Sequence, residues 1–158
     1  MTSSPKPLPS KLLNVRWPWD IEFPKQGFAM QWNLSDDGHL WILRPDSVNQ
    51  IGCIHTCQGL ELDYVGVIIG PDLVVRDGIV TTVPEARSKQ DSSIKGYKKL
   101  RKENAAEAER LASEIIKNTY RTLMTRGQKG CFVYCTDLET GLWLKAALST
   151  DTHEAETT

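Results

Sequence analysis

Residues 55–70 read HTCQGLELDYVGVIIG, and this stretch decides the fold. A polar cluster of His, Gln, Gly and Glu comes first, and the apolar run 64–69 follows directly. Such a β-branched run predicts a strand covered on both faces. A polar loop beside a buried strand is how α/β nucleotide-binding sheets present side chains to a phosphorylated ligand. The stretch therefore predicts an α/β fold with a polar site beside this strand.

Residues 118–135, NTYRTLMTRGQKGCFVYC, repeat the order of a polar segment followed by a strand-like run at 131–135. The segment 103–126 before that run has the strongest helical periodicity in the chain. Its apolar stripe comprises Ala108, Leu111, Ala112, Ile115, Ile116, Thr119 and Leu123. Gly127 is well placed to end this helix, because glycine readily adopts the left-handed conformation common after a last turn.

The remaining segments extend the alternation of strands and helices. Apolar runs predict strands at 40–43 and 48–54, and residues 138–148 show helical periodicity. Asp77-Gly78 between two apolar runs predicts a hairpin over 72–83, because this pair suits the positive φ angles of a tight turn. We therefore expect a mainly parallel sheet flanked by helices, with the hairpin as an excursion.

Composition and charge limit the classes of protein to which the chain can belong. The chain has 158 residues, is 40% hydrophobic and carries a net charge of −1, so any contact with nucleic acid must come from a local patch. We expect a flexible lead-in at 1–14, one folded domain at 15–148 and a disordered tail at 149–158. The N-terminal residues lack a signal-peptide core, and no apolar run is as long as a membrane span, so a cytoplasmic protein is expected.

The four cysteines form two pairs with three intervening residues, Cys53 with Cys57 and Cys131 with Cys135. Zinc knuckles usually have two intervening residues. We therefore expect buried, reduced thiols and no metal site.

Arg126 is the first candidate for chemistry. A helical wheel of 103–126 places it beside the apolar stripe, so its guanidinium must reach a polar pocket or an anion. Arginine suits a phosphate because its fork is planar, always charged and bidentate. Two structural roles remain open from the pattern alone: Arg126 complements the negative end of the helix dipole, or it pairs with a structural carboxylate.

The loop residues before the predicted strand at 64–69 could likewise bind a ligand or have a structural role. Glu61 could accept hydrogen bonds from a ribose or cap a turn, and His55 could touch a phosphate or hold its loop. Gln58 and Gly59 permit close approach of the backbone to a ligand, although a loop glycine usually serves turn geometry.

The basic run 89–102 contains Lys95, Lys98 and Lys99, which could bind a nucleic-acid backbone. A solvated loop and helix start is the alternative. Asp72 follows an apolar strand, as a magnesium-holding acid does, but that role needs a partner loop, Gly-x-x-x-x-Gly-Lys-Ser/Thr. The sequence contains no such loop, so Asp72 is interpreted as a turn residue.

Residues 47–73 and 118–130 resemble the C-terminal part of the Schlafen group 3-like DNA/RNA helicase domain, a P-loop NTPase family whose motor core resembles superfamily 1 helicases. The resemblance covers about residues 30 to 145 and implies a RecA-like fold for the predicted domain at 15–148, as the second motor domain. It also implies that residues 55–61 correspond to helicase motif V, which lies between nucleotide and nucleic acid.

The resemblance assigns roles to individual residues. Glu61 would contact the ribose, with Gln58 and Gly59 also binding the nucleotide, and His55 and Thr56 would face the nucleic acid. Thr125-Arg126 is similar to motif VI, so Arg126 would be an arginine finger that stabilises charge on the transferred phosphoryl group.

The family's phosphate loop and magnesium acid are not found in this sequence. The implied partner is a first motor domain that supplies them, with ATP and Mg²⁺ bound only in its presence and the chain inactive alone. Single-stranded DNA or RNA is a further implied partner, and no membrane is expected. The alternative is a non-catalytic nucleic-acid- or protein-binding module. A homodimer would cover the sheet edge that an absent domain leaves bare.

Overall fold

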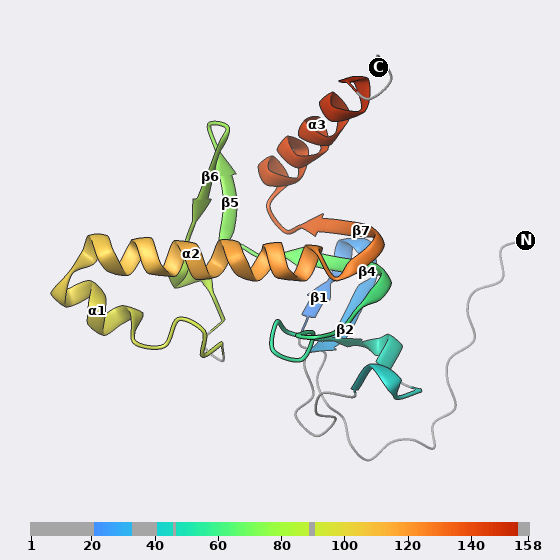
Figure 1. The fold of residues 1–158 in the computed structure, drawn as a ribbon, viewed down its shortest axis with the longest axis horizontal. Coiled ribbons are helices and arrows are strands. Elements are labelled where there is room, and N and C mark those ends of the chain that lie inside the picture. The colour runs from blue at the N-terminus through green and yellow to red at the C-terminus, as the bar shows by residue number, and fades with distance from the viewer. Residues whose placement is uncertain (1–20, 33–40, 46, 89–90, 155–158) are drawn as a thin grey trace, which may run out of the picture. The chain divides into compact units, whose positions relative to one another are not determined.

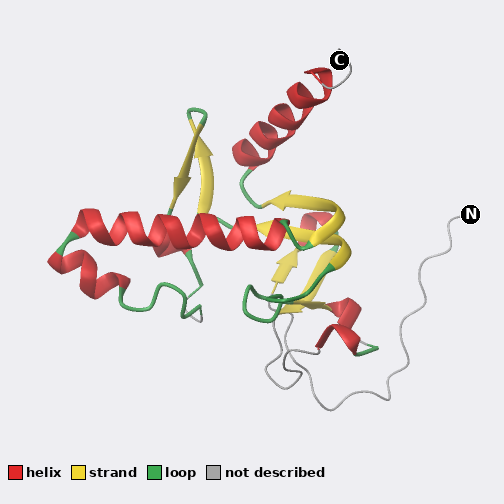
Figure 2. Ribbon diagram, viewed as in Figure 1, coloured by secondary structure: helices red, strands yellow, loops and turns green. Residues whose placement is uncertain are grey.

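The structure is a computed structural model that describes residues 21–32, 41–45, 47–88 and 91–154. The chain forms two compact units, Met1–Gln58 and Gly59–Thr158, which are described separately. Figure 2 shows helices and strands in both of them.

The first unit contains a three-stranded sheet in the order β1-β2-β3. Strand β1 (Ile21–Phe23) pairs antiparallel with β2 (Phe28–Trp32), and β2 pairs parallel with β3 (Gln50–Ile51). The strand predicted over 48–54 is therefore reduced to two residues.

The strand predicted at 40–43 is wrong for its described part. Residues 41–43 form a 3₁₀ turn, and the Arg44 amide donates to the Trp41 carbonyl at 3.0 Å. Residue 40 lies outside the described residues. A four-residue apolar run has no period that separates a strand from a turn of helix, and Pro45, two residues after the run, favours a turn.

The second unit is organised by a parallel pair of strands, β4 (Leu62–Ile69) and β7 (Gly127–Cys135). The chain between them includes α2 (Ala105–Met124), which packs against β4 (Figure 1). Val67 and Ile69 of β4 form a buried core with Ile116 and Tyr120 of α2. This strand–helix–strand crossover confirms an α/β fold with parallel pairing.

The prediction that β4 is covered on both faces is wrong. Val67 and Ile69 are buried on the face that α2 covers, whereas Tyr64 is 58% exposed. Tyr64 lies against Phe132 of β7, with ring centroids 6.2 Å apart, and Phe132 is also exposed. In the second unit, the described helices cover only one face of the pair well, so burial follows the two-residue period of the strand.

The hairpin is confirmed. Strand β5 (Leu73–Arg76) pairs antiparallel with β6 (Ile79–Thr82). Asp77 and Gly78 between them have φ angles of 51° and 74°, the left-handed values that a two-residue hairpin turn with native twist requires.

Helix α2 begins where the Asn104 side chain accepts a hydrogen bond from the Glu107 amide at 3.2 Å, a standard N-terminal cap. It follows the short helices η4 (Pro84–Ala86) and α1 (Tyr97–Glu103). Its buried positions are four residues apart: Ala108, Ala112, Ile116 and Tyr120. The predicted stripe contained the first three and missed the tyrosine. Gly127 does not end the helix, because it is the first residue of β7.

A buried ion pair ties the hairpin and the following loop to α2. The Asp72 carboxylate lies 2.8 Å from the Arg87 guanidinium, and both side chains are more than 90% buried. Asp72 also accepts a hydrogen bond from the Tyr120 hydroxyl at 2.5 Å. Arg87 is further bonded to Asp91 at 2.8 Å and to Thr119 at 3.3 Å. Asp72 is therefore more than a turn residue: it is the centre of a satisfied polar network.

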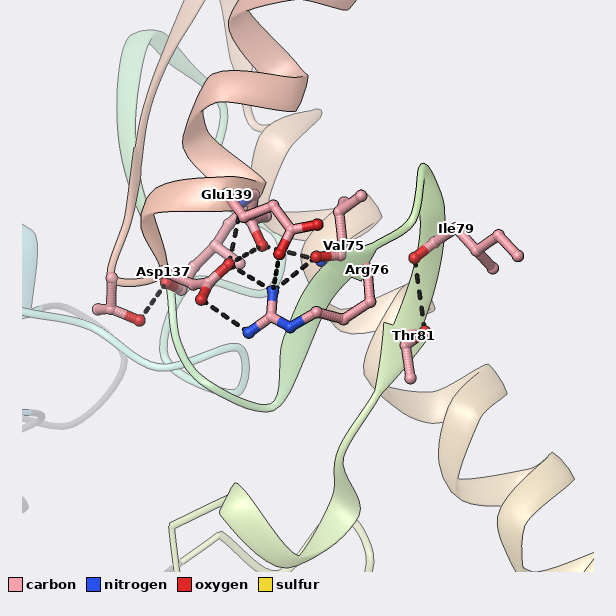
Figure 3. Close-up of polar contacts among 9 residues, drawn as sticks. Val75, Arg76, Ile79, Thr81, Asp137 and Glu139 are labelled. Atoms are coloured by element: carbon pink, nitrogen blue, oxygen red, sulfur yellow. Dashed lines mark hydrogen bonds and ion pairs between the residues drawn. The ribbon is translucent and has the colours of Figure 1, made fainter.

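Helix α3 (Leu138–Glu154) extends beyond the predicted end at residue 148. The Asp137 carboxylate caps its first turn by accepting from the Thr140 amide at 2.9 Å. The same carboxylate forms two 2.8 Å hydrogen bonds with the Arg76 guanidinium at the end of β5 (Figure 3). The Thr140 hydroxyl in turn accepts from the Val75 amide at 2.8 Å. These contacts fasten α3 to the hairpin.

We expect Arg87→Met to destabilise the second unit by about 3 to 5 kcal/mol, because it leaves the Asp72 carboxylate buried without its cation. Urea unfolding followed by circular dichroism measures this. Arg110→Met is the matched control, because Arg110 pairs with Glu107 and Glu114 on the exposed face of α2 and such pairs contribute little. Equal losses in the two variants would contradict the importance of the buried pair.

The Asp137 contact predicts a pH dependence. Hydrogen bonds from Arg76 and then Thr140 lower the pKa of Asp137, so its contribution is full above the unfolded-state pKa of about 3.9 and is lost as the pH falls through the lower folded-state pKa. Asp137→Asn should therefore be less stable than wild type at pH 7, with a difference that shrinks in strongly acidic buffer. Urea midpoints across this range test it, and a constant difference would be the contrary result.

Candidate functional site

The starts of β4 and β7 meet at one edge of the sheet, where α2 ends. The Leu62 amide donates to the Arg126 carbonyl at 3.0 Å, and Leu62 is paired with Gly127 in the parallel register. Glu61 and Arg126 each directly precede these strands. We call residues 59–63 and 125–130 the amino edge. The structure thus brings the two main predicted nucleotide-binding residues to neighbouring backbone positions.

A bulge shapes the amino edge. The register passes from Leu62 opposite Gly127 to Tyr64 opposite Gly130, so β7 has one extra residue there. A Cβ atom on Gly127 would collide with the Gly130 carbonyl oxygen, which explains glycine at this position. Bulges change the direction of neighbouring side chains and are frequent beside functional sites.

Arg126 is half-buried, and its guanidinium is only partly used within the protein. Its Nε donates to the Thr122 carbonyl in the last turn of α2 at 3.1 Å. No carboxylate of the described residues lies within 4.0 Å of it. The structure therefore supports a contact with the helix end and contradicts pairing with a structural carboxylate among those residues.

Most other described arginines of the second unit are used differently, although Arg121 likewise has no described carboxylate within 4.0 Å. Four of them form ion pairs with carboxylates at 2.8 Å or less: Arg76, Arg87, Arg101 and Arg110. Arg126 differs from these four because its guanidinium has no described carboxylate partner and its backbone neighbours that of an exposed acid, Glu61. Its planar donor fork is available for an anion from outside the described part of the unit.

Two predicted residues of the amino edge, Glu61 and Gly59, are open to solvent. The Glu61 side chain is exposed. Gly59 is also exposed and has a φ of 80°, which disfavours any other residue at this position. Asp63 and Lys129 form an exposed ion pair of 2.8 Å at the same edge. The amino edge therefore has an arginine guanidinium with no carboxylate partner among the described residues, and a solvated carboxylate.

At the opposite edge of the sheet, where β4 and β7 end, the described acidic side chains form ion pairs with arginines of the same unit. Asp72 is held by Arg87, and Asp137 is held by Arg76. Burial and then the Asp72 charge raise the pKa of the Tyr120 hydroxyl, which keeps it protonated as the donor to Asp72. Ligands of α/β sheets commonly bind beyond the carboxyl ends of strands, but the described groups there are occupied with one another.

His55, Thr56 and Gln58 belong to the first unit. His55 and Gln58 are exposed. The Thr56 hydroxyl is used within its own loop, because it accepts from the Cys53 amide at 2.9 Å and donates to the Cys53 carbonyl at 3.2 Å. Thr56 therefore has a structural role in the turn, and the predicted contact with nucleic acid stays a prediction.

The predicted lysines lie far from Arg126 along the second unit. Lys98 and Lys99 are on α1 and Lys95 is in the turn before it, and α1 packs near the start of α2. Arg126 follows the other end of that helix, and 20 helical residues span about 30 Å. The lysines and the amino edge are therefore two separate regions (Figure 1).

The cysteines are less buried than expected. Cys131 is exposed, and Cys53, Cys57 and Cys135 are intermediate. Cys131 and Cys135 differ from the prediction because the described helices of the second unit leave much of β7 uncovered. Within the described residues, no cluster of three His, Cys, Asp or Glu side chains is arranged to hold a metal ion.

Sequence reasoning missed the partners of the polar networks. Arg87, Asp91 and Asp137 carried no motif, and Tyr120 stood inside a quoted stretch without an assigned role. The one available signal was that Asp72 and Asp137 come within three residues of the ends of strand-like runs. None of the helices in the described ranges has the length and apolar character to cross a membrane.

Comparison with known proteins identifies the family. The model of the Schlafen group 3, DNA/RNA helicase domain matches residues 5–137. The chain therefore belongs to the Schlafen group 3 DNA/RNA helicase domain family.

A curated relative is the uncharacterized protein YPL245W of Saccharomyces cerevisiae, which is 33% identical over 102 residues. The match covers 63% of this chain and 21% of the yeast protein, so the chain spans about a fifth of that relative. No solved structure matches the chain.

The bulge at the amino edge gives a prediction. Gly127→Ala should destabilise the second unit by about 1 to 3 kcal/mol, because the added methyl group is forced against the Gly130 carbonyl. Gly66→Ala is the matched control in the paired strand, where a Cβ meets nothing within 4 Å; it should be neutral or slightly stabilising. Thermal or urea unfolding measures both, and a Gly127 variant as stable as the Gly66 variant would refute the close approach.

Proposed function

We propose that this chain is the second motor domain of a helicase-like ATPase acting on nucleic acid. Its amino edge would complete an ATP site whose phosphate loop and magnesium acid come from a first motor domain. Membership of the helicase domain family supports the class of function. The arrangement of Glu61 and Arg126 supports the location of the nucleotide.

The observation that carries the proposal is the joint position of an unpaired arginine and an exposed acid. The Leu62–Arg126 backbone hydrogen bond holds them at neighbouring positions, and the guanidinium has no carboxylate partner among the described residues. In ATP the γ-phosphate needs a cation, and a ribose hydroxyl needs an acceptor. Arg126 supplies the first and Glu61 the second.

Each residue has a defined chemical task. Arg126 stabilises negative charge that spreads over the transferred phosphoryl oxygens in the transition state. Its Nε bond to the Thr122 carbonyl fixes the start of the fork and leaves Nη1 and Nη2 for a phosphate. Glu61 orients the nucleotide through the ribose and does not take part in bond breaking. Mg²⁺ would be held by the first motor domain together with the phosphates.

The proposal predicts that the isolated chain neither binds ATP measurably nor hydrolyses it. Mixed with a phosphate-loop-bearing first motor domain from a longer family member, it should stimulate ATP hydrolysis. Arg126→Ala should reduce the stimulated kcat by about a thousandfold or more, the contribution of an arginine finger. Arg126→Lys should not restore it, because a lysine lacks the bidentate fork. Steady-state phosphate release with saturating ATP measures each rate.

Arg110→Ala is the matched control, since Arg110 is exposed on the same helix and pairs within it; it should retain full stimulation. Glu61→Gln should raise KM for ATP with a smaller effect on kcat. Failure of the mixture to exceed the first domain alone counts against the proposal. So does an Arg126→Ala variant that stimulates as well as Arg110→Ala, or hydrolysis by the isolated chain that disappears with Arg126.

A further inference from the structure

The outer face of α1 is a concentrated basic surface. Lys98, Lys99 and Lys102 lie on this helix and Lys95 is in the turn that precedes it. At 3.6 residues per turn, the three helical lysines fall within about 100° of one another and opposite Tyr97. All four side chains are exposed. We call these four residues the lysine face.

The inner face of α1 is committed to packing. Tyr97 is buried against Ala108 and Ala112 of α2, and Ile94 and Leu100 pack around them. The Tyr97 hydroxyl donates to Glu85 at 2.9 Å. The orientation of the helix is therefore fixed by its apolar side, and the lysines must point outward.

Three carboxylates near α1, those of Glu85, Glu109 and Asp91, are paired with arginines. The Arg101 guanidinium forms ion pairs with the carboxylates of Glu85, at 2.5 Å, and Glu109, at 3.8 Å. Asp91 is paired with Arg87. Glu103 borders the lysine face at the end of α1, but no carboxylate of the described residues is within 4.0 Å of any of the four lysines. None of the four lysines thus forms an ion pair with a described carboxylate, although the whole chain carries a net charge of −1.

We propose that the lysine face binds the phosphate backbone of a single-stranded nucleic acid. Lysines on flexible stems neutralise successive phosphates and release counterions without reading sequence. The exposed positions of α1 are all charged, whereas a protein interface needs an apolar centre. Insertion into a membrane would need the apolar face of α1, which α2 covers.

This contact is independent of the nucleotide proposed at Arg126. The lysine face lies near the start of α2 and Arg126 lies past its end, about 30 Å away along the helix. Loss of the nucleic-acid contact at the lysine face should therefore leave the nucleotide contact at Arg126 intact, and the reverse. The lysine face would serve as a backbone contact outside any motor cleft built on the amino edge.

The test measures binding of labelled single-stranded RNA and DNA of about 16 nucleotides by fluorescence anisotropy. The full chain should bind both at about 50 mM salt and lose affinity steeply by about 200 mM. The triple variant K98E/K99E/K102E should bind at least about tenfold more weakly. The slope of log affinity against log salt should fall by about 2, since each lost single-strand phosphate contact contributes about 0.7.

The matched control is K25E/K117E/K145E, which changes the net charge equally at three other exposed lysines; it should keep most of the affinity and the slope. Arg126→Ala should bind nucleic acid like wild type, so failure here is distinguishable from failure of the nucleotide proposal. Far-ultraviolet circular dichroism and urea midpoints check that each variant is folded.

Several results would overturn the proposal. One is an equal loss of affinity in the two triple variants, which would indicate that binding depends on the net charge of the chain alone. Another is no binding at low salt. A third is tighter binding to a polyglutamate peptide or to vesicles containing phosphatidylserine, which would assign the lysine face to an acidic protein or an anionic membrane.

Discussion

The parallel pairing of β4 with β7 is the constraint on which the second unit depends. Parallel neighbours cannot be joined by a short turn, so the chain must cross from the end of β4 to the start of β7. Here it does so through a hairpin and two α-helices. Helix α2 returns along the strands, covers Val67 and Ile69 with Ile116 and Tyr120, and ends where β7 begins. The position of Arg126 beside Glu61 is a direct result of this return.

The excursion between the strands is held by charge as well as by packing. Asp72, Arg87 and Tyr120 come from three different segments, and their contacts satisfy one another in a region with little solvent. Although burial opposes it, hydrogen bonds from Ser93 and the charge of Arg87 lower the pKa of Asp91, so the Asp91 carboxylate stays ionised at neutral pH. A buried guanidinium between two carboxylates suits a junction that must have one geometry, because any other arrangement leaves a charge unpaired.

Short-range sequence patterns predicted the elements whose conformation depends mainly on residues close together in the chain. The Asp77-Gly78 turn, strand β4 and helix α2 follow from short-range patterns, and the parallel order follows from their alternation. Patterns could not show that Asp72 pairs with Arg87, because each lies in a segment with an ordinary turn or loop signature and their contact depends on how the chain folds around α2. Nor could they show that one face of β4 is open, since an apolar run looks alike when covered on one face or two. For the site, the motifs predicted roles for Glu61 and Arg126, and these stay predictions; the absence of a carboxylate partner for Arg126 among the described residues required coordinates.

Helix α2 separates two unneutralised positive regions of the unit by its own length. Elsewhere in the unit, four described arginines form ion pairs with carboxylates, as Arg76 does with Asp137 and Arg101 with Glu85. At the end of α2, Arg126 presents a fixed fork, which suits a single phosphate at a defined position. Beside its start, the lysine face presents mobile point charges, which suit a chain of phosphates at variable positions. The choice of arginine at one end and lysine at the other matches the two proposed anions, which differ in how precisely they must be held.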